Sequence, residues 1–236
     1  MNENRLPGHG GNRAIWGRPG PPLFMIVVLF LMACGKSEPP VAVPVLPSQA
    51  VYRILAFGDS LTAGKDLEDP DTQAYPAILE RLLKEAGYPV TVTNGGHSGD
   101  TTFDALARLD YSLAENPQVV LVGLGSNDTF QGKRLEDIEK NLDEIVGRCQ
   151  SAGAAVVLCG MKTFPNFGFF YASDYAHMFK RVADRRRAIL VPFMLEGVAG
   201  IPEMNLPDMI HPNTRGHERV AETLRPFVEK ALKRIK

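Results

Sequence analysis

The sequence has no excess of charge of either sign, and this absence limits its partners. It contains 26 Lys and Arg residues against 27 Asp and Glu residues in a chain of 236. No basic face stands out along it. Proteins that bind nucleic acid electrostatically carry such a face. We therefore expect no nucleic-acid partner.

Repeats, metal motifs and phosphate-binding loops are also missing. No internal repeat is visible, and no group of His, Cys, Asp and Glu has the spacing of a metal site. Gly35-Lys36-Ser37 lacks the earlier glycine of a phosphate-binding loop, because Phe30 stands at that position. We expect a protein without metal or cofactor, built on one sizeable domain.

Cysteine is scarce, with three residues in the whole chain. Cys149 falls in a helical pattern and Cys159 in a strand pattern. Two thiols could pair in an oxidising compartment. Because cysteine packs well as a small apolar residue, we expect both to be free and buried, with pairing left open.

An apolar run at residues 23–33 follows a stretch that carries Arg5, Arg13 and Arg18 against Glu3. The run is too short to span a bilayer, but it suits the apolar segment of a signal peptide. The remainder of the protein is therefore expected outside the cytoplasm, in the cell envelope or periplasm.

The end of this run, Leu31-Met32-Ala33-Cys34-Gly35, resembles the lipobox of bacterial lipoproteins. Cys34 would then carry the lipid and become the mature N-terminus. Met32 is bulkier than usual there, so a plain secretory cleavage or an uncleaved anchor stays open. We expect a signal peptide at 1–33, a proline-rich linker at 34–50 and one domain at 51–236, as a monomer touching the membrane through its lipid.

From Val51 onwards, strand and helix patterns alternate, which predicts a parallel sheet covered on both faces. The expected strands are 52–57, 90–94, 118–124, 154–159 and 189–191. The expected helices are 74–87, one through Leu106 and Leu109, 134–152, 173–187 and 214–235. Right-handed crossovers between five strands predict a three-layer α/β/α domain, flavodoxin-like, with strand order 2-1-3-4-5.

Ser60 stands where the first expected strand gives way to Gly58 and Asp59. Ligands bind outside the carboxyl ends of strands in such sheets, so Ser60 is a candidate nucleophile, with a helix N-cap as the structural alternative. Asp208 and His211, three residues apart, favour the nucleophile. On one tight turn the carboxylate can orient the imidazole, which can then take the serine's proton.

Two further residues are expected near Ser60. In the order 2-1-3-4-5, the loops after the first three strands are neighbours, and they carry Ser60, Gly99 and Asn127. Acyl transfer needs donors aimed at an oxyanion, and both a glycine N–H and an asparagine amide serve this purpose. Taken singly, Gly99 fits a turn and Asn127 a helix cap. Their arrival at adjacent loops favours an oxyanion hole.

These residues resemble, in order, the four blocks of the SGNH, or GDSL, hydrolase family. The blocks are Gly58-Asp59-Ser60-Leu61, Gly99, Gly125-Ser126-Asn127-Asp128 and Asp208-Met209-Ile210-His211. The resemblance covers residues 51–235. Ser98-Gly99-Asp100-Thr101 and His211-Pro212-Asn213 are similar to the bacterial branch of thioesterases, arylesterases and lysophospholipases.

The resemblance implies a role for each site residue. Ser60 would be the nucleophile, His211 the base and acid, and Asp208 the orienting carboxylate. The N–H groups of Ser60 and Gly99, with the Asn127 amide, would form the oxyanion hole. The implied reaction is hydrolysis of a small-molecule acyl or aryl ester or thioester through an acyl-enzyme, without metal or cofactor.

Three other functions compete with this interpretation. An α/β-hydrolase has the elbow Gly-x-Ser-x-Gly, but the fifth position is Thr62 around Ser60 and Asp100 around Ser98. A deacetylase of cell-envelope polysaccharide would use the same site and stays open. A catalytically silent lipid-binding lipoprotein would need the fold but not the Ser, Asp and His set, which argues against it.

The aromatic stretch at residues 164–171 bears on substrate choice. It is expected as a loop after the fourth strand, and its apolar density suggests a wall for acyl chains or aryl groups. A loop folded over the core is the alternative. His97 is interpreted as a loop histidine satisfied by backbone, and His177 as ordinary helix surface.

Overall fold

A computed structural model describes residues 51–163 and 168–235. The expected signal peptide at 1–33 and linker at 34–50, including Cys34, lie outside the described residues. So do residues 164–167, the first half of the aromatic stretch.

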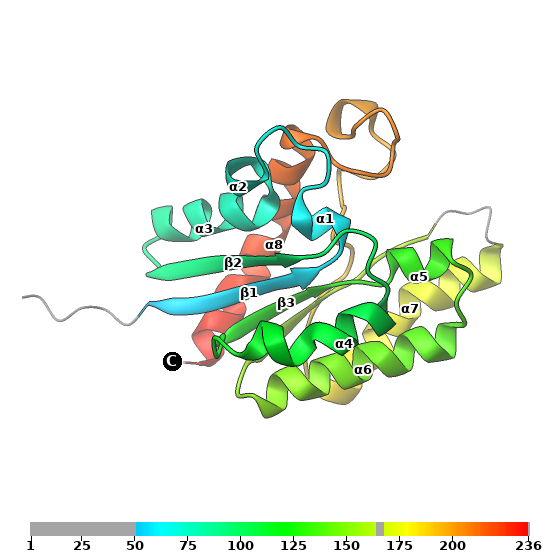
Figure 1. Ribbon diagram of the computed structural model, residues 1–236, viewed down its shortest axis with the longest axis horizontal. Helices are drawn as coiled ribbons and strands as arrows, with labels where there is room; N and C mark the ends of the chain where they lie inside the picture. The colour runs from blue at the N-terminus through cyan, green and yellow to red at the C-terminus, as the bar shows by residue number, and fades with distance from the viewer. Residues whose placement is uncertain (1–50, 164–167, 236) are drawn as a thin grey trace, which may run out of the picture. The chain divides into compact units, whose positions relative to one another are not determined.

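Five parallel strands form one sheet in the order β2-β1-β3-β4-β5, as the sequence predicts (Figure 1). They are β1 (Tyr52–Gly58), β2 (Val90–Gly96), β3 (Val119–Gly123), β4 (Ala155–Cys159) and β5 (Ile189–Val191). Gly58, the last residue of β1, pairs with Gly96 of β2 and with Gly123 of β3. The loops that follow these three strands therefore leave the sheet at the same level.

Helices cover both faces of the sheet, which confirms the three-layer architecture (Figure 1). One face is covered by α3 (Tyr75–Glu85) and α8 (Thr214–Arg234). The opposite face is covered by α4 (Thr102–Leu113), α6 (Leu135–Ser151) and α7 (Phe169–Arg186). Because both faces are covered, β3 is buried along its whole length, from Val119 to Gly123.

Short helical segments between the longer helices and the strands were not predicted. They are α1 (Ser60–Ala63), α2 (Pro70–Gln73), α5 (Ser126–Phe130) and the 3-10 turn Pro202–Met204. The start of α7 was also predicted wrongly, because the helix begins at Phe169 and not at residue 173. Gly168, at φ +95, precedes it without a side-chain cap, so the usual N-terminal signal is absent.

Close backbone contacts fix α1 against the ends of β1 and β2. A Cβ atom on Gly96 would lie 2.1 Å from the Ala63 nitrogen, and one on Gly58 would lie 2.0 Å from the Thr62 Oγ1. Side chains at these two positions would push α1 away from the sheet. The first residue of that helix is Ser60, so the glycines determine where its hydroxyl lies.

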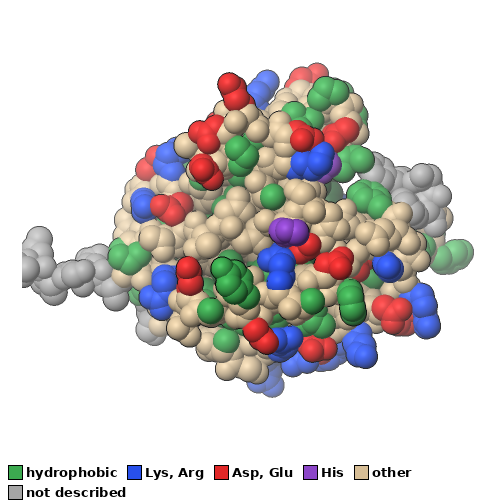
Figure 2. Space-filling model, in the orientation of Figure 1, with side chains coloured by type: hydrophobic (Ala, Val, Ile, Leu, Met, Phe, Trp, Pro, Cys, Tyr) green, Lys and Arg blue, Asp and Glu red, His purple; other side chains and the backbone are tan. Residues whose placement is uncertain are grey.

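Cys149 and Cys159 are both free and buried, as expected. Burial raises the pKa of each thiol to about 12. On the face of the described residues in Figure 2, basic and acidic side chains are interspersed. Within residues 51–163 and 168–235, no helix has the length and apolar character needed to cross a membrane.

Candidate active site

Ser60 is the first residue of α1, directly after the β1 edge. Asp59 is the N-cap of this helix, where its Oδ1 accepts a hydrogen bond from the Leu61 nitrogen at 3.0 Å. The structural alternative for Ser60, an N-cap, is thereby wrong, because the neighbouring Asp59 takes that role. Ser60 keeps its hydroxyl for another partner.

That partner is His211, which lies 151 positions further along the chain. Its Nε2 is 3.0 Å from the Ser60 Oγ, and its Nδ1 is 2.5 Å from the Asp208 Oδ2. Because the carboxylate accepts, Nδ1 carries the proton. Nε2 is then free to accept the proton of the serine hydroxyl. The structure therefore brings together the three residues predicted from sequence.

A tight turn aligns Asp208 with His211, as their spacing predicted. The Asp208 Oδ1 accepts hydrogen bonds from the backbone nitrogens of Ile210 and His211, each at 3.0 Å. Burial by itself would raise the pKa of Asp208. The His211 ring and these two N–H groups outweigh burial and hold the pKa well below its usual value. Asp208 therefore stays ionised beside the imidazole.

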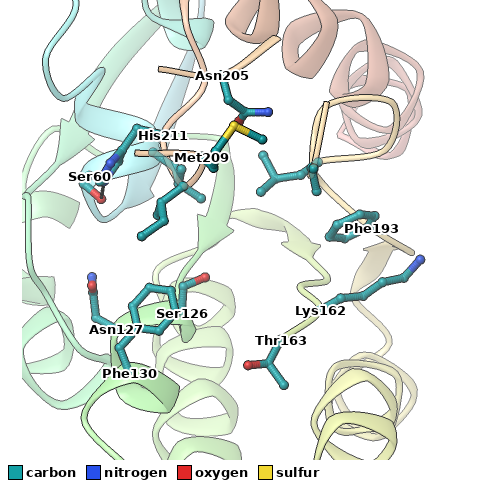
Figure 3. A pocket seen from close by; sticks show the side chains of 15 residues that line it. Ser60, Ser126, Asn127, Phe130, Lys162, Thr163, Phe193, Asn205, Met209 and His211 are labelled. Atoms are coloured by element: carbon teal, nitrogen blue, oxygen red, sulfur yellow. Dashed lines mark hydrogen bonds between the residues drawn. The ribbon is translucent and has the colours of Figure 1, made fainter. Parts of the chain in front are cut away.

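Asn127 also reaches the site, from the first turn of α5. It lines the same cavity as Ser60 (Figure 3). Its Nδ2 donates to the Asp100 carbonyl at 2.9 Å. An amide nitrogen has two hydrogens, so one remains for a ligand. Gly99, at φ +91, precedes Asp100 in a conformation that favours glycine. This hydrogen bond joins the loop after β2 to the loop after β3.

Arg108 and Asp128 hold these loops, and sequence reasoning missed both. Arg108 donates to the Asp100 Oδ2 at 2.6 Å and to the Gly58 carbonyl at 2.9 Å. Asp128 accepts from the Thr102 nitrogen at 2.8 Å and from its hydroxyl at 2.6 Å. For Arg108 the available signal was its spacing of eight residues from Asp100, and for Asp128 it was the place beside Asn127 in the block Gly125-Ser126-Asn127-Asp128.

The expectation for His97 is corrected in part. Its backbone nitrogen donates to the Gly58 carbonyl at 3.0 Å, but its ring contacts the Asp100 carboxylate at 2.9 Å. A side chain, not backbone, therefore satisfies the ring. The His177 ring contacts the Ser173 carbonyl one turn earlier on α7, as expected of an ordinary surface histidine.

Asp59 is a buried acid directly before Ser60. Its Oδ2 has no hydrogen-bond partner among the described residues. Burial, reinforced by the nearby charges of Asp100 and Asp128, raises the pKa of Asp59 to about 7. The Oδ1 of Asp59 therefore caps α1, while its Oδ2 has no structural role among the described residues.

A second buried group, His217, supports the site from α8. Its Nδ1 accepts from the Tyr75 nitrogen at 3.2 Å, so the ring is neutral there. The Tyr75 hydroxyl in turn bonds the Thr62 Oγ1 at 2.9 Å. Burial, with a smaller effect from His211, lowers the pKa of His217 to about 4. This chain of contacts connects α8 to the helix that carries Ser60.

A cavity of about 430 Å³ opens beside the Ser60 hydroxyl (Figure 3). Most of its lining is apolar, drawn from the loops after β1, β3, β4 and β5 and from the His211 turn. The lining residues are Ser60, Leu61, Ser126, Asn127, Phe130, Lys162, Thr163, Phe193, Leu195, Ala199, Gly200, Asn205, Met209, Ile210 and His211. Such a cavity suits the apolar part of a small ligand.

The predicted wall from residues 164–171 is not found in the described part of that stretch. Phe169 and Phe170 begin α7 and are 80% and 87% exposed, and neither lines the cavity. Phe130, Phe193 and Met209 line it in their place. In residues 51–163 and 168–235, no group of three or more His, Cys, Asp and Glu is placed to hold a metal ion.

The model of the GDSL-like Lipase/Acylhydrolase family matches residues 56–219, which span the Ser60 and His211 loops. The chain belongs to this family. An arylesterase of Vibrio mimicus is 36% identical over 176 residues, 74% of this chain and 87% of the relative. Esterase TesA of Pseudomonas aeruginosa is 35% identical over 184 residues, 78% of this chain and 90% of the relative.

Solved structures of family members agree. The crystal structure of TesA has a TM-score of 0.73 and 35% identity, and covers 76% of this chain and 99% of that one. An esterase EstA from Pseudoalteromonas has a TM-score of 0.72 and 27% identity, and covers 77% and 98%. Membership of this family makes the chain an SGNH-type hydrolase of ester bonds.

Proposed function

We propose that the chain is a serine esterase for small molecules with apolar acyl or aryl groups, with Ser60 as nucleophile. The observation that carries this proposal is the continuous contact from the Ser60 hydroxyl through His211 to Asp208, at the mouth of an apolar cavity. Serine, imidazole and carboxylate in this arrangement are suited to acyl transfer.

In the first step, the Ser60 Oγ attacks the ester carbonyl carbon and its proton moves to the His211 Nε2. The imidazolium so formed is stabilised by the ionised Asp208. The bond from the carbonyl carbon to the leaving oxygen or sulfur then breaks, and the leaving group takes the proton from Nε2. The acyl group remains on Ser60.

In the second step, water attacks the acyl-enzyme and passes a proton to the His211 Nε2. The bond between the acyl carbon and the Ser60 Oγ breaks, and Oγ recovers the proton. The free acid leaves and the enzyme returns to its starting state. No electron is transferred, so this route needs no redox partner.

The negative oxygen formed in both steps would be held by the Ser60 and Gly99 N–H groups and the Asn127 amide. The support is the contact between Asn127 and Asp100, which leaves one amide hydrogen for the ligand. Removal of one such donor typically costs about 3–4 kcal/mol of barrier. Several donors together would account for a large part of the rate enhancement over the uncatalysed hydrolysis.

The cavity lining supports apolar acyl or aryl groups over sugar acetates. A sugar needs hydrogen-bonding groups around its ring, while the walls here include Phe130, Phe193, Leu195 and Ile210. Relatives named arylesterase and thioesterase 1/protease 1/lysophospholipase L1, the latter 31% identical in Escherichia coli, agree with this class. Oxygen esters and thioesters are both included in the proposal.

Location and assembly are part of the proposal. Residues 1–33 and the Cys34-Gly35 junction support export and lipid anchoring, with the protein acting as a monomer at the cell envelope. Growth with radiolabelled palmitate should label the full chain and leave Cys34→Ser unlabelled. An unlabelled wild-type chain would contradict the anchor. Sedimentation of detergent-solubilised protein should give the mass of one chain.

The test of the function is hydrolysis of p-nitrophenyl esters from acetate to palmitate, beside palmitoyl-CoA and an acetylated sugar. Ser60→Ala is the control, and its circular dichroism should match that of the wild type. Activity on acyl esters that disappears in Ser60→Ala is expected. Full activity in this folded variant would overturn the role of Ser60, and activity on the sugar alone would favour a deacetylase.

A further inference from the structure

Met209 has a backbone conformation that its side chain disfavours. Its φ is +59, in the left-handed region. The other non-glycine residues with positive φ in the described chain are Asp66, Asn116 and Arg187. Asp and Asn enter this region readily because their side chains bond locally, and Arg187 ends α7, where this conformation is common. Met209 has neither explanation.

Hydrogen bonds on both sides of Met209 hold its backbone in this conformation. Its nitrogen donates to the Leu206 carbonyl at 2.9 Å, and the Leu206 nitrogen donates to the His211 carbonyl at 2.8 Å. The Asp208 Oδ1 binds the two nitrogens that follow Met209. Strain of this kind persists where surrounding contacts over-determine the backbone, and it gathers at functional sites.

The side chain of Met209 enters the cavity beside Ser60. It lines the wall next to His211, across the cavity from Phe130 (Figure 3). It is 38% exposed, so it is not needed to fill the core. Glycine would adopt this φ without strain but would leave that wall open.

We propose that Met209 is a specificity-determining residue, held in a strained turn so that its thioether forms the wall against which the substrate's acyl or aryl group packs. This inference rests on the proposed esterase function. A thioether is flexible and polarisable, and it packs well against both aliphatic chains and aromatic rings. The substrate class is therefore esters whose acyl or aryl part extends beyond acetyl.

Three variants of the full chain separate strain from packing. Met209→Gly removes both, Met209→Ala removes the thioether but keeps the strain, and Met209→Leu keeps an apolar wall. Arg187→Gly is the matched control, because it relieves a left-handed residue that lies outside the cavity lining. For each, kcat/KM is measured with p-nitrophenyl octanoate and acetate, which share a leaving group, and Tm is measured alongside.

The ratio of octanoate to acetate kcat/KM should fall about tenfold in Met209→Gly and Met209→Ala, the loss expected from about two methylene contacts. Met209→Leu should stay near the wild-type ratio. Tm should rise by about 2–4 °C in Met209→Gly and in Arg187→Gly, but not in Met209→Ala. The control should keep the wild-type ratio.

An unchanged ratio in Met209→Gly and Met209→Ala would overturn the proposed packing role. If Tm rises in Arg187→Gly but not in Met209→Gly, the assignment of strain to Met209 is overturned. These outcomes differ from failure of the esterase proposal, because that failure appears as activity retained in Ser60→Ala on every ester.

Discussion

Arg108 donates a hydrogen bond to the Asp100 carboxylate at 2.6 Å, and the carbonyl of that same Asp100 accepts the Asn127 amide at 2.9 Å. A second donor of Arg108 holds the Gly58 carbonyl, two residues before Ser60. One side chain therefore connects the loops after β1 and β2, and Asp100 connects them to the loop after β3. The guanidinium fork suits such a bidentate task.

Replacement of Arg108 by Met should lower kcat by about tenfold to hundredfold, because the proposed oxyanion donors would lose their alignment. KM should change much less, since Arg108 does not line the cavity. Arg108→Lys should recover part of kcat. Steady-state kinetics with p-nitrophenyl butyrate measures both constants.

Arg81→Met is the matched control for this experiment. Arg81 forms an exposed pair with Glu85 on α3 and, unlike Arg108, makes no hydrogen bond to Gly58 or Asp100. Its kcat should equal that of the wild type. An Arg108→Met enzyme with normal kcat, or one in which KM alone changes, would show that Arg108 does not align the oxyanion donors.

Asp59→Asn should change how stability depends on pH. In the native protein the pKa of Asp59 is about 7, above the unfolded value near 4, so the folded state binds the extra proton. Stability is therefore lost as pH rises from 4 to 7, by up to about 4 kcal/mol. The neutral amide does not titrate. Urea unfolding should show that the free energy of unfolding of the variant, relative to that of the wild type, is higher at pH 8 than at pH 4.

A constant difference between variant and wild type at the two pH values would contradict this assignment. The cap can survive the substitution, because the Asn oxygen can still accept from the Leu61 nitrogen. Hydrolysis at pH 8 reports whether Ser60 is still in place.

His217→Gln should protect the fold against acid. The pKa of His217 is lowered to about 4, below the ordinary 6.5, so the unfolded chain takes up its proton first as pH falls. The wild type thus loses up to about 3 kcal/mol between pH 6.5 and pH 4. A glutamine oxygen can accept from the Tyr75 nitrogen without titrating.

Urea unfolding at several pH values in this window measures the effect. The exposed His177 supplies the control, since His177→Gln removes a histidine without touching Tyr75. If His217→Gln and the wild type lose stability in parallel, His217 is not the acid-sensitive group.

Gly96→Ala should be severely destabilising. The added Cβ would meet the Ala63 nitrogen at 2.1 Å, and backbone on both sides prevents easy relief. We expect a loss of about 3 kcal/mol or more, or failure to fold. Gly123 ends β3, on the other side of β1 from β2, and the atom nearest to an added Cβ there would be the Met194 sulfur at 3.4 Å.

Gly123→Ala is therefore a matched substitution at the same level of the sheet, and it should change Tm by only a few degrees. Thermal melts measure the Tm of both variants and of the wild type. Equal melting temperatures would mean that α1 does not rest on Gly96 as closely as the structure describes.

The sheet and the three central site residues could be predicted from sequence because their signals are local. An apolar run ending at Gly58 indicates a buried strand, and the three-residue spacing of Asp208 and His211 allows a shared turn. Parallel strands joined by helices have few allowed orders, so the neighbouring loops also followed. Asn127 was predicted near Ser60 for that reason and lines the same cavity, while the role of Gly99 in an oxyanion hole stays a prediction.

The network behind the site could not be predicted, because it depends on contacts between distant segments. Arg108 shows no local pattern that separates it from a surface charge, and the place of Asp128 in the block after the third strand does not indicate its contact with Thr102. The cavity walls from Phe193 and Leu195 lie in an irregular stretch after β5, where no periodicity predicts direction. The aromatic stretch misled for the opposite reason, since its composition indicated burial while Phe169 and Phe170 are exposed.

The Ser60 hydroxyl and the His211 ring meet across 151 positions of sequence, and the turn that brings His211 precedes the last helix, α8. Contacts between residues this distant in sequence slow folding, because the loop-closure entropy must be overcome before they form. Ester hydrolysis is therefore a sensitive reporter of complete refolding. During refolding from urea, far-ultraviolet circular dichroism will recover from local helices, while turnover will return only with the last long-range contacts.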